Sequence, residues 1–351
     1  MTVTSTIHGP ASAALAALTP AQIAFLERLP KAELHAHLNG SIPLALLQDL
    51  AREHAASASA DSDAVRAGLQ RLQAGVQLDE IGDFFGLFPA IYALMETPDA
   101  LRRAAQAVLR LFLEEGEGGA VPQVAYLELR STPKETPHMS RRAYLETVLD
   151  EVERYPAEKA ALIVSLDRRM DGAVAEEIIA VCAQLKAEGR RVVGVDLCGD
   201  PMAGNMAEFK SYFAKAREAG LGVTLHIAET DKNPSEETLE LLACRPQRLG
   251  HATFLDAAAK AVVHSYEPCI ELCLTSNLLC KTVKTLEDHH IQYYLKHGHP
   301  IAICTDDVLP FRNSMLGEYA LLMAPKPLGL GLSEQEIATV AKMSMEHRFK
   351  L

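Results

Sequence analysis

The chain has 351 residues, 48% of them hydrophobic, and a formal net charge of −12. An acidic chain is repelled by polyphosphate surfaces, which argues against nucleic acid or an anionic membrane as a general partner. The first residues lack a signal-peptide pattern, no apolar run approaches 18 residues, and the seven cysteines include no C-x-x-C pair, so we expect a soluble cytosolic protein without disulfides.

Short apolar segments alternate with longer amphipathic ones along most of the chain. Segments such as 176–190 and 201–220 have helical periodicity and end near glycine, as helices often do. Eight alternations predict an α/β fold, a (β/α)8 TIM barrel. The alternative is a doubly wound open sheet, but the G-x-G-x-x-G turn typical of that fold does not follow the first predicted strand. The predicted strands are 32–38, 123–130, 160–166, 191–197, 222–228, 247–253, 269–276 and 299–307.

The interval between the first two predicted strands, about 42–122, is too long for one helix. It contains an Ala/Ser-rich piece at 53–64, predicted to be an exposed loop or helix end, and a stretch at 78–116 that predicts two or three helices. An insertion after a barrel strand lies at the C-terminal face, where it can cap a pocket. No repeat or long linker divides the chain, so we expect one domain over 1–351.

Two histidines stand at alternate positions of the first predicted strand. Alternation places Glu33, His35 and His37 on one face, with the imidazoles about 7 Å apart along the strand. Such a pair can converge on one metal ion. In isolation it can equally be two hydrogen-bonded core histidines.

Other polar residues fall at the ends of later strands. His226 ends the fifth strand and Glu229 follows three residues later in the loop, His251 ends the sixth strand, and Asp306 and Asp307 end the eighth. Catalytic groups of barrel enzymes come from these strand ends, so the set predicts one metal-dependent active site. Three imidazole nitrogens and one carboxylate suit Zn²⁺ with an open position, and iron or manganese are the alternatives.

The remaining candidates receive structural interpretations. Arg130 shares a strand face with Glu128, which predicts an ion pair inside the barrel as an alternative to a ligand-binding role. Four more histidines fall in a polar helical stretch and at a strand start, away from the predicted catalytic end, where we expect surface or structural roles. They are His289, His290, His297 and His299.

Seven motifs occur in one order between residues 29 and 320: ELHAHLNGSI, LELRSTP, GVDLCGD, HIAET, GHATFL, LTSN and CTDD. This set resembles the adenosine deaminase family, a zinc branch of the amidohydrolase barrels. HLNGS and LELRSTP are typical of the adenosine deaminase-like subgroup that acts on N6-methyl-AMP. Nucleoside deaminases more usually carry an aspartate where Asn39 stands.

The resemblance implies a role for each matching residue. One Zn²⁺ per chain would be bound by His35, His37, His226 and Asp306. Glu229 would deliver a proton to purine N1, and His251 would orient and polarise the attacking water, whose proton Asp306 or His251 can take. Asp307 would hydrogen-bond purine N7, and the backbone of Gly199 would contact N3.

The turn after the first strand indicates a phosphate site. An aspartate at position 39 would repel a 5′-phosphate, whereas the amide of Asn39 can donate a hydrogen bond to it. Ser131, Thr132 and Lys134 offer further donors or charge. The alternative is purely structural, because Asn-Gly is a good turn dipeptide and STPK is a common helix entry.

These inferences predict a zinc-dependent hydrolytic deaminase that converts N6-methyl-AMP to IMP and methylamine. The alternatives are an adenosine or adenine deaminase and a metal-binding barrel without catalysis. The expected partner is a small purine nucleotide. We expect a monomer that binds neither nucleic acid nor membranes.

Overall fold

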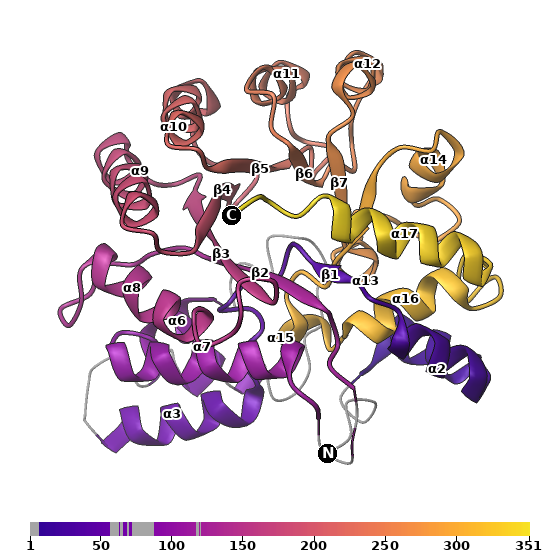
Figure 1. Ribbon diagram of the computed structural model, residues 1–351, viewed down its shortest axis with the longest axis horizontal. Helices are drawn as coiled ribbons and strands as arrows, with labels where there is room; N and C mark the ends of the chain where they lie inside the picture. Colours follow the sequence, from indigo (N-terminus) through magenta and orange to yellow (C-terminus); the bar gives the residue numbers. More distant parts are fainter. Residues whose placement is uncertain are drawn as a thin grey trace.

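The computed structural model describes residues 7–56, 63, 66–68, 70–71, 88–116, 119 and 121–351. Eight parallel strands follow one another around a single sheet in chain order, and helices surround them (Figure 1). The first and last strands also lie against each other, so the ring is nearly closed. The predicted (β/α)8 TIM barrel is therefore confirmed.

The strands are β1 (Ala32–Glu33), β2 (Tyr126–Ser131), β3 (Ala160–Asp167), β4 (Val192–Cys198), β5 (Gly222–Ile227), β6 (Arg248–His251), β7 (Cys269–Leu272) and β8 (Ile301–Ile303). The helices before β4 are α1 (Gly9–Ala16), α2 (Pro20–Arg28), α3 (Leu44–Ala56), α6 (Phe88–Leu94), α7 (Pro98–Leu113), α8 (Arg141–Val152) and α9 (Gly172–Ala187). Those after it are α10 (Met206–Glu218), α11 (Ser235–Ala243), α12 (Ala257–Tyr266), α13 (Leu274–Leu279), α14 (Ile291–Lys296), α15 (Val308–Phe311), α16 (Met315–Met323) and α17 (Glu334–Glu346).

Several strands are shorter than predicted. The predicted seventh strand, 269–276, was wrong in its second half, because the chain turns into α13 directly after Cys273. The Asn277 N–H donates to the Cys273 carbonyl at 2.9 Å, which places the LTSN motif in a helix. β1 and β8 likewise end before their functional residues, which therefore lie in short irregular segments at the mouth of the barrel.

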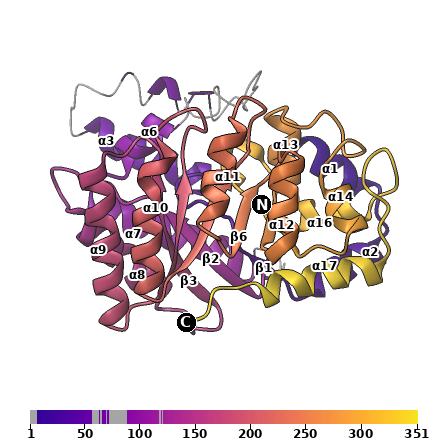
Figure 2. The ribbon, with the colours of Figure 1, turned by 90° about the horizontal axis from the view of Figure 1, so that it is seen from above.

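The interval 42–122 contains α3, α6 and α7 among its described residues. α7 packs on β2 and α8 and thus belongs to the outer layer of the barrel. α3 and α6 lie at the end of the barrel opposite α17 (Figure 2). Most of the predicted loop at 53–64, and the first part of the predicted helices at 78–116, fall outside the described residues.

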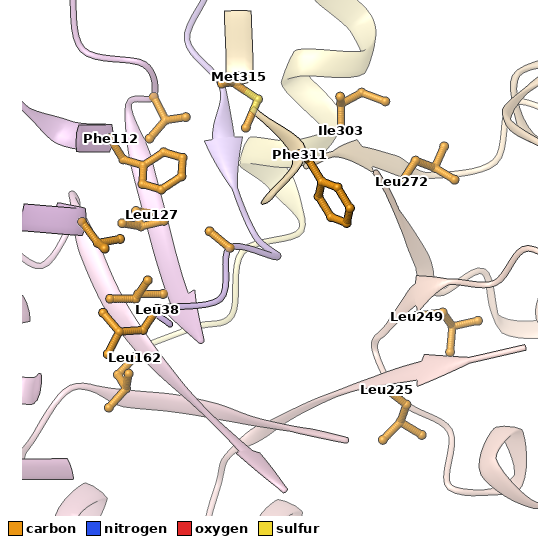
Figure 3. Close-up of a cluster of buried hydrophobic side chains, with 14 of the residues drawn as sticks. Leu38, Phe112, Leu127, Leu162, Leu225, Leu249, Leu272, Ile303, Phe311 and Met315 are labelled. Atoms are coloured by element: carbon orange, nitrogen blue, oxygen red, sulfur yellow. The ribbon is translucent and has the colours of Figure 1, made fainter. Parts of the chain in front are cut away.

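An apolar layer separates the strands from the helices. Leu127, Leu162, Leu225, Leu249 and Leu272 come from five different strands and are fully buried. Their side chains point away from the barrel axis, as Figure 3 shows. Burying each such side chain contributes about 1.5–3 kcal/mol, so this layer holds the barrel rigid around its interior.

An apolar cluster fills part of the barrel interior at the amino ends of the strands. This second buried cluster includes Tyr126, Ile163 and Phe349. The Phe349 ring lies against Gly194 and Gly222, where an added Cβ would overlap it, so two glycines make room for one aromatic plug. The helix α17, which precedes this plug, packs on β1 and β8.

The seam between β1 and β8 is joined by side chains as well as backbone. The described strands β1 and β8 form no ladder with each other. Instead, the Glu33 carboxylate accepts hydrogen bonds from the N–H of His35 at 2.7 Å and from the N–H and Oγ1 of Thr305, both at 2.8 Å. Beside it the His37 N–H donates to the Asp306 carbonyl at 3.2 Å.

The predicted alternation fails at Glu33 for this reason. Its side chain points to the seam, whereas Leu34 joins the interior cluster beside Ala302 and Cys304. The irregular backbone after Glu33 then shifts the alternation by one residue, so that His35 and His37 still face inward.

None of the described helices combines the length and apolar character needed to cross a bilayer.

Candidate active site

Four predicted ligands converge at the carboxyl ends of the strands. His35 Nε2 and His37 Nε2 lie 3.0 and 3.2 Å from His226 Nε2, and 3.8 and 3.6 Å from Asp306 Oδ1. Ligand atoms at about 2.0–2.1 Å from a tetrahedral ion are roughly 3.3 Å apart. The observed separations bracket that value, so the four groups fit one small divalent ion.

The opposite ring nitrogens show how these imidazoles are held. His35 Nδ1 lies 2.6 Å from Glu271 Oε2, and His226 Nδ1 lies 3.0 Å from Asp196 Oδ1. Each Nδ1–H donates to a buried carboxylate, which leaves a lone pair on each Nε2. Two lone pairs 3.0 Å apart repel each other unless a cation lies between them, and histidines that bind a metal usually donate their other ring N–H to a carboxylate in this way.

Arg130 contacts both of these carboxylates from inside the barrel. Its guanidinium lies 3.1 Å from Asp196 Oδ1 and also contacts Glu271. The predicted ion pair inside the barrel exists, but its predicted partner was wrong: Glu128 pairs with Arg248 at 2.7 Å. Breaking a fully buried pair by removing one partner typically costs about 3–5 kcal/mol, so these charges hold each other in place.

Glu229 and His251 lie beside the ligand cluster. Glu229 Oε1 is 3.6 Å from His251 Nε2. Burial, with the Asp306 carboxylate adding to it against the opposing effect of His226, raises the pKa of Glu229 to about 7. Burial and the neighbouring His226 lower the pKa of His251, which favours its neutral form. A carboxyl group that holds a proton near neutral pH can act as a general acid.

The backbone is left-handed at three of these strand ends. The φ angle is 47° at Ala228, 59° at His251 and 62° at Asp306. Left-handed conformations cost non-glycine residues about 1–3 kcal/mol and concentrate at functional sites. The surrounding barrel therefore imposes a conformation that aims the side chains into the opening.

Two glycines allow close approach in the same region. An added Cβ at Gly40 would overlap the Asp307 carboxylate, so only glycine fits in that turn. Gly199 has a φ of 96°, and an added Cβ would lie 2.7 Å from Asp167 Oδ1.

Burial and the adjacent Asp306 raise the pKa of Asp307, whose Oδ1 has no hydrogen-bond partner among the described residues.

One cavity of about 400 Å³ joins the predicted residues. His35 lies fully buried beneath it. The predicted residues that line the cavity are His37, His226, Glu229, His251, Asp306, Asp307, Gly199, Asn39, Ser131, Thr132 and Lys134. The structure therefore brings the whole predicted set to one place, while the individual roles stay predictions.

The polar residues after β2 form the other end of the cavity. The Ser131 hydroxyl lies 2.8 Å from the hydroxyl of Tyr144, which also hydrogen-bonds Asn39. Lys134 Nζ lies 4.4 Å from the ring centroid of Tyr92 in α6, and it forms no ion pair with a described residue. A cation and several hydroxyl groups thus face the cavity there.

Sequence reasoning missed several residues of the site. Asp196 and Glu271 carried a usable signal, since each is a lone acid within an apolar strand. Asp167 and Arg169 also line the cavity. Nε and Nη2 of Arg169 donate to Oδ1 and Oδ2 of Asp167 at 2.9 and 2.6 Å. Tyr92 carried no signal, because only the folding of the 42–122 interval brings α6 to the cavity.

The predicted position of His290 was wrong, because this residue does not lie away from the catalytic end. Its Nε2 donates to the His251 carbonyl at 2.8 Å, which is a structural role of the kind predicted. His289, stacked on it, is buried and lies 3.0 Å from Asn277 Oδ1. His289 and His290 thus belong to a network behind His251, whereas His297 in the same stretch is exposed.

Comparison with known proteins agrees with this geometry. The family model described as "Adenosine deaminase" matches residues 30–350. An "Adenosine deaminase-like protein" of Drosophila melanogaster is 33% identical over 93% of both chains, and an "N6-Methyl-AMP deaminase" of Danio rerio is 33% identical over 93% of this chain and 92% of its own. A solved ADAL–IMP complex has a TM-score of 0.81 and 30% identity over 94% of both chains. The chain belongs to the adenosine deaminase family and is a hydrolytic deaminase that acts on C–N bonds.

Proposed function

We propose that the protein is a zinc-dependent deaminase of a 6-aminopurine nucleotide, and that it converts N6-methyl-AMP to IMP and methylamine. One observation carries the proposal: a single cavity has the histidine–aspartate cluster and Glu229 at one end and hydroxyl groups with Lys134 at the other. Such a cavity suits a purine ring and a 5′-phosphate together. The relatives named N6-methyl-AMP deaminase and the ADAL–IMP complex support this substrate class.

The ligand chemistry supports one zinc ion, held by His35, His37, His226 and Asp306. Three imidazoles and one carboxylate are all usual zinc ligands, and a catalytic zinc ion can expand to a fifth position, which would be left for water. When bound there, zinc makes water nucleophilic at neutral pH by lowering its pKa. The Nδ1 bonds to Asp196 and Glu271 keep two of the imidazoles oriented for this role.

The remaining residues handle protons and orient the purine. Glu229 holds a proton in a buried setting and delivers it to N1 as negative charge develops there. His251 and Asp306 orient the attacking water and accept its proton. Asp307 hydrogen-bonds N7 and the backbone of Gly199 contacts N3, so the ring is held with C6 toward the histidines.

The 5′-phosphate would lie at the Lys134 end of the cavity. Lys134 supplies charge, while Asn39, Ser131 and Thr132 supply hydrogen-bond donors. The Tyr144 hydroxyl, which contacts both Ser131 and Asn39, fixes the positions of these groups. Charge-assisted hydrogen bonds of this kind are about twice as strong as neutral ones, which favours a nucleotide over a nucleoside.

A comparison of substrates tests the proposal. We expect kcat/KM to be highest for N6-methyl-AMP and lower for N6-methyladenosine, AMP, adenosine and adenine. Equal values for N6-methyl-AMP and N6-methyladenosine would contradict the phosphate site. Stoichiometric zinc without any deamination would instead favour the metal-binding barrel. The monomeric state and the cytosolic location stay predictions.

A further inference from the structure

We propose that Phe349, at the amino end of the barrel, positions the metal ligand His35 at the opposite end through a buried relay centred on Arg248. The inference rests on the proposed metal site and adds to it a positioning element outside the cavity. Three sets of contacts carry it, from the plug to the ligand.

The first set joins the segment after α17 to the lower barrel. The Phe349 N–H donates to Glu128 Oε1 at 2.7 Å, and the Phe349 ring centroid lies 3.8 Å from Arg248 Cζ. The carbonyl of His347 accepts from Arg248 Nη1 at 3.0 Å. The His347 carbonyl and the Phe349 ring thus both contact the guanidinium of Arg248.

The second set crosses the middle of the barrel. Arg248 is 1% exposed, and both of its carboxylate partners are fully buried. Its Nη1 lies 2.7 Å from Glu128 Oε2, and its Nε donates to Glu271 Oε1 at 2.7 Å. A planar guanidinium fixes direction as well as distance, so a tilt of Arg248 moves Glu271.

The third set reaches the metal site. The other oxygen of Glu271, Oε2, lies 2.6 Å from His35 Nδ1. Thr224 Oγ1 donates to Oε1 at 3.0 Å, so the carboxylate is shared between a ligand and its supports. Carboxylates that orient ligating histidines affect metal affinity by about 10–100-fold, and any group that sets the carboxylate shares in that effect.

The aromatic face has a specific function in this relay. Arg248 Nη2 has no hydrogen-bond partner among the described residues, so stacking on Phe349 is what covers the guanidinium plane. An aliphatic side chain would fill the same space without the π face that attracts a cation. Phe349→Leu therefore loosens Arg248 with a small change in volume.

The test compares Phe349→Leu with Phe213→Leu. Phe213 lies in α10, is fully buried, and belongs to the outer apolar layer and not to the cluster that contains Phe349, so its substitution reports the effect of core damage. Zinc dissociation constants are measured by chelator competition, at a temperature well below the unfolding transitions of the two variants. We expect Phe349→Leu to weaken zinc binding about 10-fold, and Phe213→Leu to leave it within twofold of the wild type.

A second variant approaches the relay from another side. Glu128→Gln keeps an acceptor for the Phe349 N–H but removes the charge that faces Arg248. We expect weaker zinc binding again, and a double variant with Phe349→Leu that loses less than the sum of the two single effects on a logarithmic scale. The visible spectrum of the Co²⁺-loaded protein should change in both relay variants and not in Phe213→Leu.

Two outcomes separate this inference from the proposed function. A wild-type protein that binds no stoichiometric metal would overturn the metal site itself. A wild type that binds zinc, with Phe349→Leu and Glu128→Gln both within twofold of it, would overturn the relay alone and leave Phe349 a structural plug.

Discussion

The two ends of the cavity are built differently. At the metal end, His35, Asp196 and Glu271 are all fully buried, and the rings of His35 and His226 each have a carboxylate behind them. At the other end, Lys134 is half-buried and 52% of the Arg169 side chain is exposed. The metal end draws its residues from the strand ends, whereas the other end draws on loops and α6.

This difference suits the metal end to the reaction itself and the Lys134 end to the choice of substrate. Rigid strand ends with buried charges hold reacting groups in one geometry, which proton transfer and metal binding require. Loops and an inserted helix tolerate substitution, so the choice of substrate can change there without disturbing the reaction. Changes at the metal end should therefore affect turnover and metal binding, and changes at the Lys134 end should affect KM.

The largest effect should come from Glu229→Gln. An amide has no carboxyl proton to deliver, so kcat should fall about 10²–10⁴-fold. Zinc content should stay unchanged, because Glu229 is not one of the four ligands. Glu236→Gln, an exposed carboxylate on the neighbouring α11, is the matched control and should keep full turnover. Substantial turnover by Glu229→Gln would remove the proton-transfer role.

Stability should depend on the ionisation of Glu318, a fully buried carboxyl group in α16. Burial raises the pKa of Glu318 to about 7, although hydrogen bonds from Thr275 and Asn313 oppose the shift. The native state keeps a proton that the unfolded chain releases near pH 4.5, so the free energy of unfolding should fall by about 3 kcal/mol as pH rises from about 4.5 to 7.

Urea unfolding at several pH values checks this expectation. Glu318→Gln imitates the protonated form and should lack this part of the pH dependence. The difference between the wild-type and variant curves isolates Glu318 from other titrating groups. Parallel curves would show that the pKa of Glu318 is the same in the folded and the unfolded protein.

Asp196→Asn should have an intermediate effect. The amide keeps the shape but loses the charge that orients His226 Nδ1, so zinc affinity should fall about 10–100-fold. Chelator competition measures it, and added zinc should restore most of the turnover. Unchanged affinity would mean that His226 is oriented by its backbone alone.

The smallest effect should come from Lys134→Met. Loss of one cation at the open end should raise KM for N6-methyl-AMP about 10-fold, with kcat and the KM for N6-methyladenosine unchanged. Lys260→Met is the matched control, because Lys260 makes a similar contact at 4.7 Å with the Tyr293 ring on the outer helices. An equal change for nucleotide and nucleoside would place the phosphate elsewhere.

Much of the barrel was predictable, because each strand is a short buried run and many site residues lie at or close to the end of such a run. His226, His251 and Asp306 could be identified for that reason. The partner of Arg130 could not, since strand alternation gives the face of a residue but not which of several interior acids it meets. Strand alternation gave the wrong face for Glu33, because β1 is only two residues long and the Glu33 side chain reaches across the seam to Thr305.

The seam between β1 and β8 has a consequence for how the protein opens. His35 and His37 follow one strand and Asp306 follows the other, so an ion bound to all three would act as a cross-link over the weakest joint of the ring. Escape of the ion and parting of the two strands would then be a single event. After chelation, amide hydrogen exchange should accelerate at His37 and Thr305 before it does so in the long ladder between β3 and β4.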